Sequence, residues 1–375
     1  MNKIINEHKC CVFVQIRILF IEVELIYFMN KKRILHPMEN KILKQSIVSF
    51  KKNFGFQIEI EEFQNDNYDF RTDAVLKIKN QLMELKFFAE IKSTVNSSVI
   101  GFMLHHKNDF PHTQLLVSNY INPVMAERLK DNDINFIDTA GNAYINAYPV
   151  FIFVKGNKEK KLQVASFKGK AFTQSGLKMI YALLCDKKLL NRSYRDIARE
   201  SGIALGTVGQ VIDNLKKQGF VIDMGSQGKK LTNDKALFDR WCMDYSEKLK
   251  PKLFLGTFAG PDDFCKQFHL ETNQGQWGGE VAAFQLTNYL KPENALIYVK
   301  EEKLRDIVIQ NRLKRDEKGN IEIFKIFWSI DDKEENPIVH PFMVYADLLE
   351  TNNQRTIETA KMIYDQNIAR HFRKS

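Results

Sequence analysis

Two acidic residues and a lysine in the first half of the chain have a spacing suited to metal-assisted hydrolysis. Asp73 falls in one expected strand, 72–78, and Glu90-Ile91-Lys92 ends the next, which begins at Leu85. Residues two apart on a strand share a face, and a hairpin turn at 79–81 brings the two strands together. Two carboxylates there can hold a divalent cation, Mg²⁺ or Mn²⁺, and the Lys92 ammonium can orient water or balance phosphate charge.

This arrangement resembles the PD-(D/E)xK signature of restriction-endonuclease-like nucleases, in which catalysis would rest on Asp73, Glu90 and Lys92 and the metal on the two carboxylates. No proline precedes Asp73, and an aspartate followed by E-x-K is common by chance. Two interpretations stay open: an active nuclease, or a degenerate or purely structural use of the same fold. The second is favoured.

A second group of polar residues has the character of a DNA-reading surface. Thr207, Gln210 and Asn214 lie opposite the apolar stripe of an expected helix, where they could bond base edges or phosphates. Gly206 and Gly209 would permit a close backbone approach. Solvation alone is the alternative explanation for Gln210 and Asn214. The predicted DNA contacts are Ser193, Thr207, Gln210, Asn214, Lys216, Lys229 and Lys230, the lysines serving as phosphate contacts.

The elements around these residues predict a winged helix-turn-helix. Ser193 can cap a short helix, with Asp196 in its first turn, and Gly202 breaks that helix. The second helix begins near Ala204 and ends before Gly219. Its apolar stripe has helical spacing: Val208, Val211, Ile212 and Leu215. Two short strands, 220–222 and 230–232, flank a turn at 226–228 as a wing, and a helix at 177–184 supplies the third packing partner.

The positive charge of the chain is concentrated around this module. The 375 residues carry a formal net charge of +9, with a pI near 9.1. Residues 155–235 alone contain 17 Lys and Arg against 7 Asp and Glu, a net charge of +10. A solvated basic face is the simple explanation, but the overlap with the expected helix-turn-helix favours phosphate contact. The predicted partner is double-stranded DNA.

The cysteines, the histidines and the N-terminus indicate a cytoplasmic protein without a membrane partner. The five cysteines have no paired spacing, so a disulfide framework is not expected. The cluster His105, His106 and His112 lacks matching acidic or cysteine spacing for a metal. Residues 10–28 are apolar but contain Arg17, Glu22 and Glu24, unlike a membrane span. Met29-Asn30-Lys31 repeats Met1-Asn2-Lys3, so residues 1–28 are expected to be a mis-assigned start or a disordered extension. A genuine extra strand or a membrane-surface segment is the alternative.

The periodicity of the chain predicts three domains, of which the winged helix is the central one. Helix and strand patterns alternate through residues 29–160, as in an α/β layer with parallel neighbours and a restriction-endonuclease-like fold. A basic linker precedes the winged helix at 171–235. Residues 236–375 are expected to form an α+β domain that begins with a helix at 236–250. The fold class is therefore α/β plus α+β, multidomain.

Two glycine-containing segments could bind a ligand, but ordinary turn or helix-entry structure also explains each of them. Residues 135–144 end a strand in a Gly-Asn turn, where a ligand role for Asp138 or Asn142 is possible, although turn chemistry alone explains the pattern. Trp277-Gly278-Gly279-Glu280 precedes an alanine-rich helix and could form an anion-binding nest, or only a tight helix entry. The chain contains no G-x-G-x-x-G motif, no Walker loop and no Ser/His/Asp arrangement.

Several segments, taken together and in order, resemble AbiEi-family antitoxins of type IV toxin–antitoxin systems. These segments are INFIDTAGNAY at 134–144, AFT…GLK at 171–178, the winged helix, WGGEVAA at 277–283 and HPFMVYADLL at 340–349. The resemblance implies an antitoxin that represses its own operon and counteracts a nucleotidyltransferase-type toxin without forming a stable complex with it. In the familiar layout the winged helix opens the chain, whereas here an α/β unit precedes it.

The sequence therefore predicts a DNA-binding regulator that acts as the antitoxin of such a pair and needs no cofactor. A metal-dependent nuclease targeted by the winged helix is the alternative, and only that alternative requires Mg²⁺ or Mn²⁺. A third interpretation, a winged helix that binds protein, fits the concentrated basic charge less well.

Overall fold

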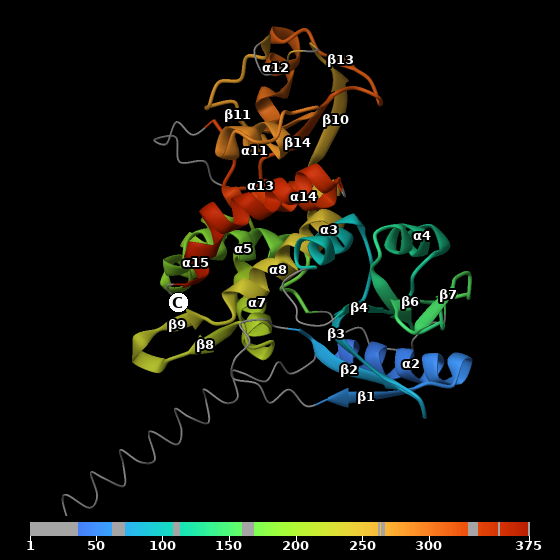
Figure 1. The fold of residues 1–375 in the computed structure, drawn as a ribbon. Helices are drawn as coiled ribbons and strands as arrows, with labels where there is room; N and C mark the ends of the chain where they lie inside the picture. The colour runs from blue at the N-terminus through green and yellow to red at the C-terminus, as the bar shows by residue number, and fades with distance from the viewer. Residues whose placement is uncertain are drawn as a thin grey trace, which may run out of the picture.

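The computed structural model describes residues 37–61, 72–107, 113–159, 169–261, 263, 267–328, 337–351 and 353–373. The expected extension at 1–28 lies outside these residues, as does much of the basic linker. The fold is mixed α/β, with a seven-stranded, a five-stranded and a two-stranded sheet (Figure 1).

The N-terminal sheet places its seven strands in chain order, β1 to β7. Strands β3, β4 and β5 are parallel neighbours, and the remaining pairs are antiparallel. The α/β layer and its parallel strands were correctly predicted. The strands are β1 (Gln57–Glu61), β2 (Ala74–Lys79), β3 (Glu84–Lys92), β4 (Thr113–Ser118), β5 (Asn135–Asp138), β6 (Ala143–Ala147) and β7 (Val150–Val154).

Helices cover both faces of this sheet. Helix α2 (Pro37–Phe54) buries Ile42, Leu43 and Phe50 against one face. The opposite face packs against α3 (Ser97–His105) and α4 (Pro123–Asp131). Figure 1 shows α3 and α4 above the sheet and α2 beside its lower strands. All three helices fall where the apolar periodicity predicts them, because each has one face rich in apolar residues, whose burial is favourable.

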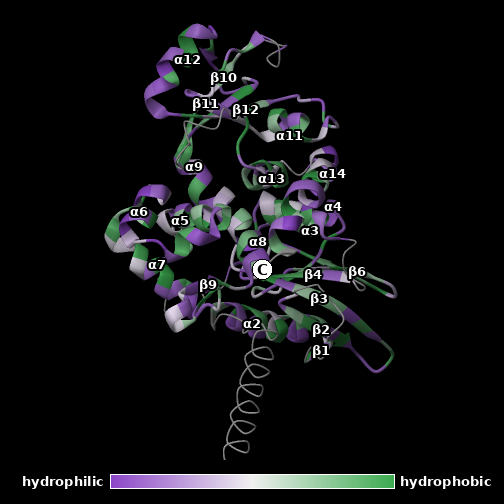
Figure 2. Ribbon diagram, turned by 90° about the vertical axis from the view of Figure 1, so that its left-hand side faces the viewer, coloured by the Kyte–Doolittle hydropathy of each residue, from purple (hydrophilic) through white to green (hydrophobic). Residues whose placement is uncertain are grey.

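Three helices and a short ribbon follow in the middle of the chain. Helix α5 packs against both α6 and α7, and the two-stranded sheet β8–β9 follows directly. In Figure 2, α6 and α7 lie at one outer side of the molecule. The elements are α5 (Gln174–Cys185), the 3₁₀ turn η1 (Lys187–Asn191), α6 (Tyr194–Ser201), α7 (Leu205–Lys217), β8 (Val221–Asp223) and β9 (Lys229–Leu231).

A long helical segment connects this central unit to the rest. It comprises α8 (Asp234–Asp244), a π-helical turn η3 (Tyr245–Leu249) and α9 (Lys250–Leu253), where a helix was expected at 236–250. Trp241 is fully buried within it, and its indole N–H donates to the carbonyl of Leu177 on α5 at 2.9 Å. A buried indole with its donor satisfied fixes this helix against α5.

The C-terminal sheet has the order β11-β12-β14-β10-β13, in which β12 and β14 are parallel. The sequence predicted β12, β14 and the helices α11, α13 and α14, but it did not predict β10 or β11. The strand that was expected at 321–328 ends at Lys325 in the structure. The elements are β10 (Phe254–Ala259), β11 (Gly275–Gly278), α11 (Gly279–Thr287), β12 (Ala295–Val299), α12 (Leu304–Gln310), β13 (Lys314–Arg315), β14 (Ile321–Lys325), α13 (Pro341–Glu350), α14 (Gln354–Ile363), the π-helical turn η5 (Tyr364–Ile368) and α15 (Ala369–Arg373).

The three parts share buried contacts. Helix α3 of the N-terminal unit packs on α13 and α14 of the C-terminal unit, and a single buried cluster runs from α3 and α4 through α5 to α13. No helix among the described residues has the length and apolar character to cross a membrane.

His340 caps the central helix α13 of this shared core. Its Nδ1 accepts a hydrogen bond from the backbone N–H of Phe342 at 3.2 Å. Burial, and to a smaller extent the nearby His371, lowers the pKa of His340 to about 4. A proton on Nδ1 would remove the acceptor and place positive charge at the positive end of the helix dipole.

We expect the free energy of unfolding to fall as the pH drops from about 6.5 toward 4, because the unfolded chain binds a proton that folded His340 does not. Asparagine at this position keeps a capping acceptor without titrating. His340→Asn should therefore remove up to about 3 kcal/mol of the pH dependence. Urea unfolding at several pH values measures it, with His269→Asn at an exposed histidine as the control. Equal slopes in wild type and His340→Asn would contradict this assignment.

Candidate nucleic-acid interface

Helix α7 has one buried and one open face. Val208, Val211, Ile212 and Leu215 are fully buried, as their helical spacing predicted. On the open face Gln210 is exposed, Thr207 is half-buried and Leu205 is 48 % exposed. Gln210 and Thr207 are therefore accessible to a ligand that approaches from outside.

The turn before α7 forms as its residue types predict. Ser193 caps α6: its hydroxyl accepts a hydrogen bond from the backbone N–H of Asp196 at 3.1 Å and donates to the Asp196 carboxylate at 2.6 Å. Gly202 follows α6 with φ of 61°, a conformation that glycine adopts without steric cost. Since the Ser193 hydroxyl already serves the cap, a contact from Ser193 to DNA remains a prediction.

The ribbon β8–β9 is held to the central helices by one side chain. The Asn191 amide donates to the carbonyl of Lys229 at 2.8 Å and accepts from the Lys229 backbone N–H at 2.7 Å. Asn191 therefore bonds to β9 as a neighbouring strand would. Gly228 precedes β9 with φ of +83°, and a Cβ there would lie 2.5 Å from the Asn191 oxygen. These two hydrogen bonds from Asn191 fix the position of the backbone at Lys229, and therefore of the neighbouring Lys230.

The three predicted phosphate lysines differ in their surroundings. Lys230 is exposed, and Lys229 lies with its ammonium 6.0 Å from the centre of the Tyr194 ring. Lys216 forms an ion pair with Asp223 on β8 at 2.8 Å. The hydrogen bond to Asp223 raises the pKa of Lys216, and the same bond lowers the pKa of Asp223. Because the pair is exposed, a phosphate can replace Asp223 at little cost.

Asn214 does not fit its predicted role as a base contact. Its side chain is buried, and its Oδ1 accepts hydrogen bonds from the backbone N–H of Ala171 at 3.2 Å and from Gln218 at 2.8 Å. The sequence placed Asn214 on the open face because it is polar and borders the apolar stripe. The segment that enters the unit at Gly169 to Ala171 covers it, so Asn214 supports the fold of the unit instead.

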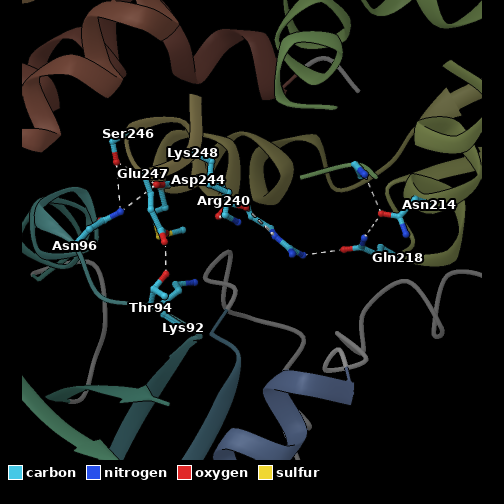
Figure 3. Close-up of polar contacts among 12 residues, drawn as sticks. Lys92, Thr94, Asn96, Asn214, Gln218, Arg240, Asp244, Ser246, Glu247 and Lys248 are labelled. Atoms are coloured by element: carbon cyan, nitrogen blue, oxygen red, sulfur yellow. Dashed lines mark hydrogen bonds and ion pairs between the residues drawn. The ribbon is translucent and has the colours of Figure 1, made fainter. Parts of the chain in front are cut away.

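The bonds of Asn214 continue into the helix α8. Gln218 accepts from Arg240 at 2.8 Å, and Arg240 forms an ion pair with Asp244 at 3.7 Å (Figure 3). The Arg240 guanidinium also lies 3.6 Å from the centre of the Phe172 ring. A stacked and hydrogen-bonded arginine of this kind fixes two helices relative to each other.

Sequence reasoning missed Tyr194 and Arg195, which are exposed on the first turn of α6. Tyr194 is 41 % exposed and packs near Gly209, where a Cβ would lie 3.5 Å from its ring. Both residues directly follow the capping Ser193, and that position was the available signal. The sequence alone suggests that a tyrosine at this position packs in the core, whereas part of the Tyr194 side chain is exposed to solvent.

The structure does bring Asp73, Glu90 and Lys92 together. The Lys92 ammonium lies 3.0 Å from the Glu90 carboxylate and 3.8 Å from the Asp73 carboxylate. Asp73 Oδ2 also accepts the backbone N–H of Ile91 at 2.7 Å. The hairpin β2–β3 positions all three residues on the face opposite α2, as predicted from the strand alternation.

This cluster is closed to solvent. The side chain of Asp73 has no exposed surface, and those of Glu90 and Lys92 are 6 % and 14 % exposed. Asp73 and Glu90 are the two residues here that could hold a divalent cation. Within the described part of the chain no three His, Cys, Asp or Glu side chains lie close enough to bind a metal together.

In the two glycine-containing segments, the candidate ligand-binding groups form hydrogen bonds with other residues of the protein. Asp138 accepts hydrogen bonds from Ile121 and from the backbone and side chain of Asn142, all at 2.7–2.9 Å, and burial raises its pKa. At the predicted nest, the Gly279 N–H donates to Asp347 on α13 at 3.4 Å. The turn and helix-entry interpretations therefore account for both segments.

Asp347 belongs to a buried polar network at the centre of the C-terminal unit. It accepts hydrogen bonds from the Tyr298 hydroxyl at 2.8 Å and forms an ion pair with Lys250 at 3.0 Å. Burial opposes the charge of Lys250, but Asp347 and Glu350 outweigh it and raise the Lys250 pKa. Buried charges so fully paired hold helices together and are not free for a ligand.

Comparison with known families gives one match. Residues 230–369 match a family model described as "Transcriptional regulator, AbiEi antitoxin, Type IV TA system". The matched segment begins within β9 and ends in α15, so it contains α8, the C-terminal sheet and α13. No curated protein and no solved structure matches the chain.

Proposed function

We propose that this protein is the antitoxin of a type IV pair and represses its own operon, because residues 230–369 match the model of the AbiEi family of antitoxins and transcriptional regulators. Its central helices and the ribbon β8–β9 act as a winged helix-turn-helix on double-stranded DNA. Its partner toxin is of the nucleotidyltransferase type and is counteracted without a stable complex. Both proteins would act in the cytoplasm.

Two glycines on the open face of α7 carry the DNA-binding proposal. A Cβ at Gly206 would meet no atom within 4 Å, and one at Gly209 would make an ordinary contact with Tyr194. Neither glycine is required by the fold, although each costs about 0.5–1 kcal/mol relative to alanine inside a helix. Close approach of an outside backbone accounts for that cost, and a duplex held by Lys229 and Lys230 supplies such a backbone.

The double variant Gly206→Ala and Gly209→Ala should be more stable than wild type by about 1 kcal/mol and yet bind DNA more weakly, because two methyl groups obstruct the contact surface. Chemical denaturation and fluorescence anisotropy with the DNA upstream of the gene measure the two effects. Stabilisation with unchanged affinity would show that α7 does not meet DNA closely.

Replacing Lys229 and Lys230 by alanine should weaken binding to every sequence, since phosphate contacts do not read bases. The slope of log affinity against log salt should decrease by about 2, one unit for each lost phosphate contact. A gel-shift titration at several salt concentrations tests this. Lys314→Ala with Lys318→Ala, at two exposed lysines in and after the edge strand β13 of the C-terminal sheet, removes the same charge and should leave the slope unchanged.

A metal-dependent nuclease is the second candidate, because Asp73, Glu90 and Lys92 converge as that chemistry requires. Their enclosure favours a structural or degenerate use of the nuclease-like fold proposed for residues 29–160. Incubation of the protein with supercoiled plasmid and Mg²⁺ or Mn²⁺ should leave the plasmid intact. Cleavage by wild type that disappears in Glu90→Gln would establish the nuclease instead.

A further inference from the structure

Helix α2 carries a row of lysines on the face that points away from the sheet. Lys44, Lys51 and Lys52 are exposed and lie seven and eight residues apart, which places them on one side of the helix. Val48, between them, is 59 % exposed. The opposite side of α2 is the one buried in the core.

These lysines have no acidic partners in the described structure. None of the three forms an ion pair with a described residue. The neighbouring strands behave differently, because their lysines and glutamates neutralise one another in a ladder. The ladder pairs are Lys79–Glu59 at 2.5 Å, Lys86–Glu61 at 2.8 Å, Lys77–Glu84 at 3.3 Å and Lys77–Glu61 at 3.7 Å. The acidic residues of β1 thus form their ion pairs on the sheet, and Lys44, Lys51 and Lys52 have no acidic partner among the residues that the structure describes.

Stabilisation of the helix end explains only part of this row. Lys51 and Lys52 lie in the last turn of α2, where positive charge suits the helix dipole. Lys44 lies in the middle of the helix, where that effect is absent because it decays within one turn. A row that extends over two helical turns is better suited to a regularly charged ligand.

The N-terminal unit is fixed relative to the central unit by contacts at two points of the helical segment formed by α8 and η3. Thr94 donates to Glu247 at 2.7 Å, and Asn96 contacts Ser246 at 3.5 Å, while Arg240 on the same helical segment bonds to Gln218 of α7 (Figure 3). Helices α3 and α13 also meet so closely at Gly101 that a Cβ there would lie 2.0 Å from the Leu349 carbonyl oxygen. The lysine row and α7 therefore keep a defined relative position.

Both views place α2 and the ribbon β8–β9 at the same end of the molecule. The C-terminal sheet lies at the opposite end (Figures 1 and 2). A duplex held at the ribbon can therefore run toward α2 without meeting the C-terminal unit.

We propose that Lys44, Lys51 and Lys52 of α2 form a second phosphate-binding surface for the duplex that the central unit binds. This inference rests on the proposed DNA binding and extends its footprint to the N-terminal unit. The surface reads no bases, because lysines on phosphates contribute affinity and orientation without sequence information. It gives the α/β unit, whose acidic cluster is closed, a role in binding the same DNA.

The test compares three proteins, with the Lys229→Ala and Lys230→Ala variant as a reference, on a mixed-sequence duplex of about 40 base pairs, long enough for several helical turns. The first is wild type, and the second carries Lys44→Gln, Lys51→Gln and Lys52→Gln, since glutamine retains helix propensity. The third carries Lys77→Gln, Lys79→Gln and Lys86→Gln, which remove the same charge from the ladder of the same unit. Thermal unfolding confirms that all three are folded.

We expect the α2 variant to lose about tenfold or more in affinity near 0.1 M salt, with a decrease of about 2–3 in the salt slope. The ladder variant should stay near wild type. This inference would be wrong, and the proposed DNA binding would stand, if the α2 variant kept the affinity and salt slope of wild type while Lys229→Ala with Lys230→Ala still weakened binding. Equal losses in both triple variants would also overturn it, because net charge would then explain the effect. Failure of wild type to bind any duplex would reject the proposed DNA binding as well.

Discussion

The close crossing of α3 over α13 is the constraint on which the arrangement of this protein depends. At Gly101 the two backbones are so near that only glycine fits between them. Buried side chains around this crossing extend without a break from the N-terminal sheet to the C-terminal one. Since protein interiors are densely packed and transmit strain, the units cannot shift independently. The N-terminal unit is thereby held beside helices that precede and follow it in the chain.

The polar side chains of the central unit fall into two groups: some form hydrogen bonds within the unit, and others are exposed to solvent. Asn214, Gln218 and Arg240 bond to one another and to the entering chain, so their hydrogen-bonding capacity is used. Asn191 is used in the same way on β9. The open face has Gln210, Lys230 and two glycines that contribute nothing to packing. A surface of this composition has a cost in stability, and the proposed DNA binding would account for that cost.

The sequence predicted most elements of the N-terminal and central units because their apolar residues repeat with clear periods. It also predicted that Asp73, Glu90 and Lys92 share a face, which strand alternation alone determines. It could not predict that Asn214 is covered, because its partner Ala171 lies 43 residues earlier in the chain. Strand β11 was missed for a related reason: the glycines Gly275 and Gly278 disfavour a strand, and pairing with β12 makes the segment a strand.

Lysine has two distinct roles in the N-terminal unit, and the contrast between them bears on function. Lys92 is enclosed with two carboxylates, where its charge offsets the cost of burying them. Lys44 and Lys51 are exposed and have no acidic partner among the described residues, so no ion pair within that part of the chain uses their charge. A nuclease would need the first group open to its substrate, whereas a DNA-binding surface needs only the second. The distribution of charge thus favours binding over cleavage for this unit, independently of the family match in the C-terminal part.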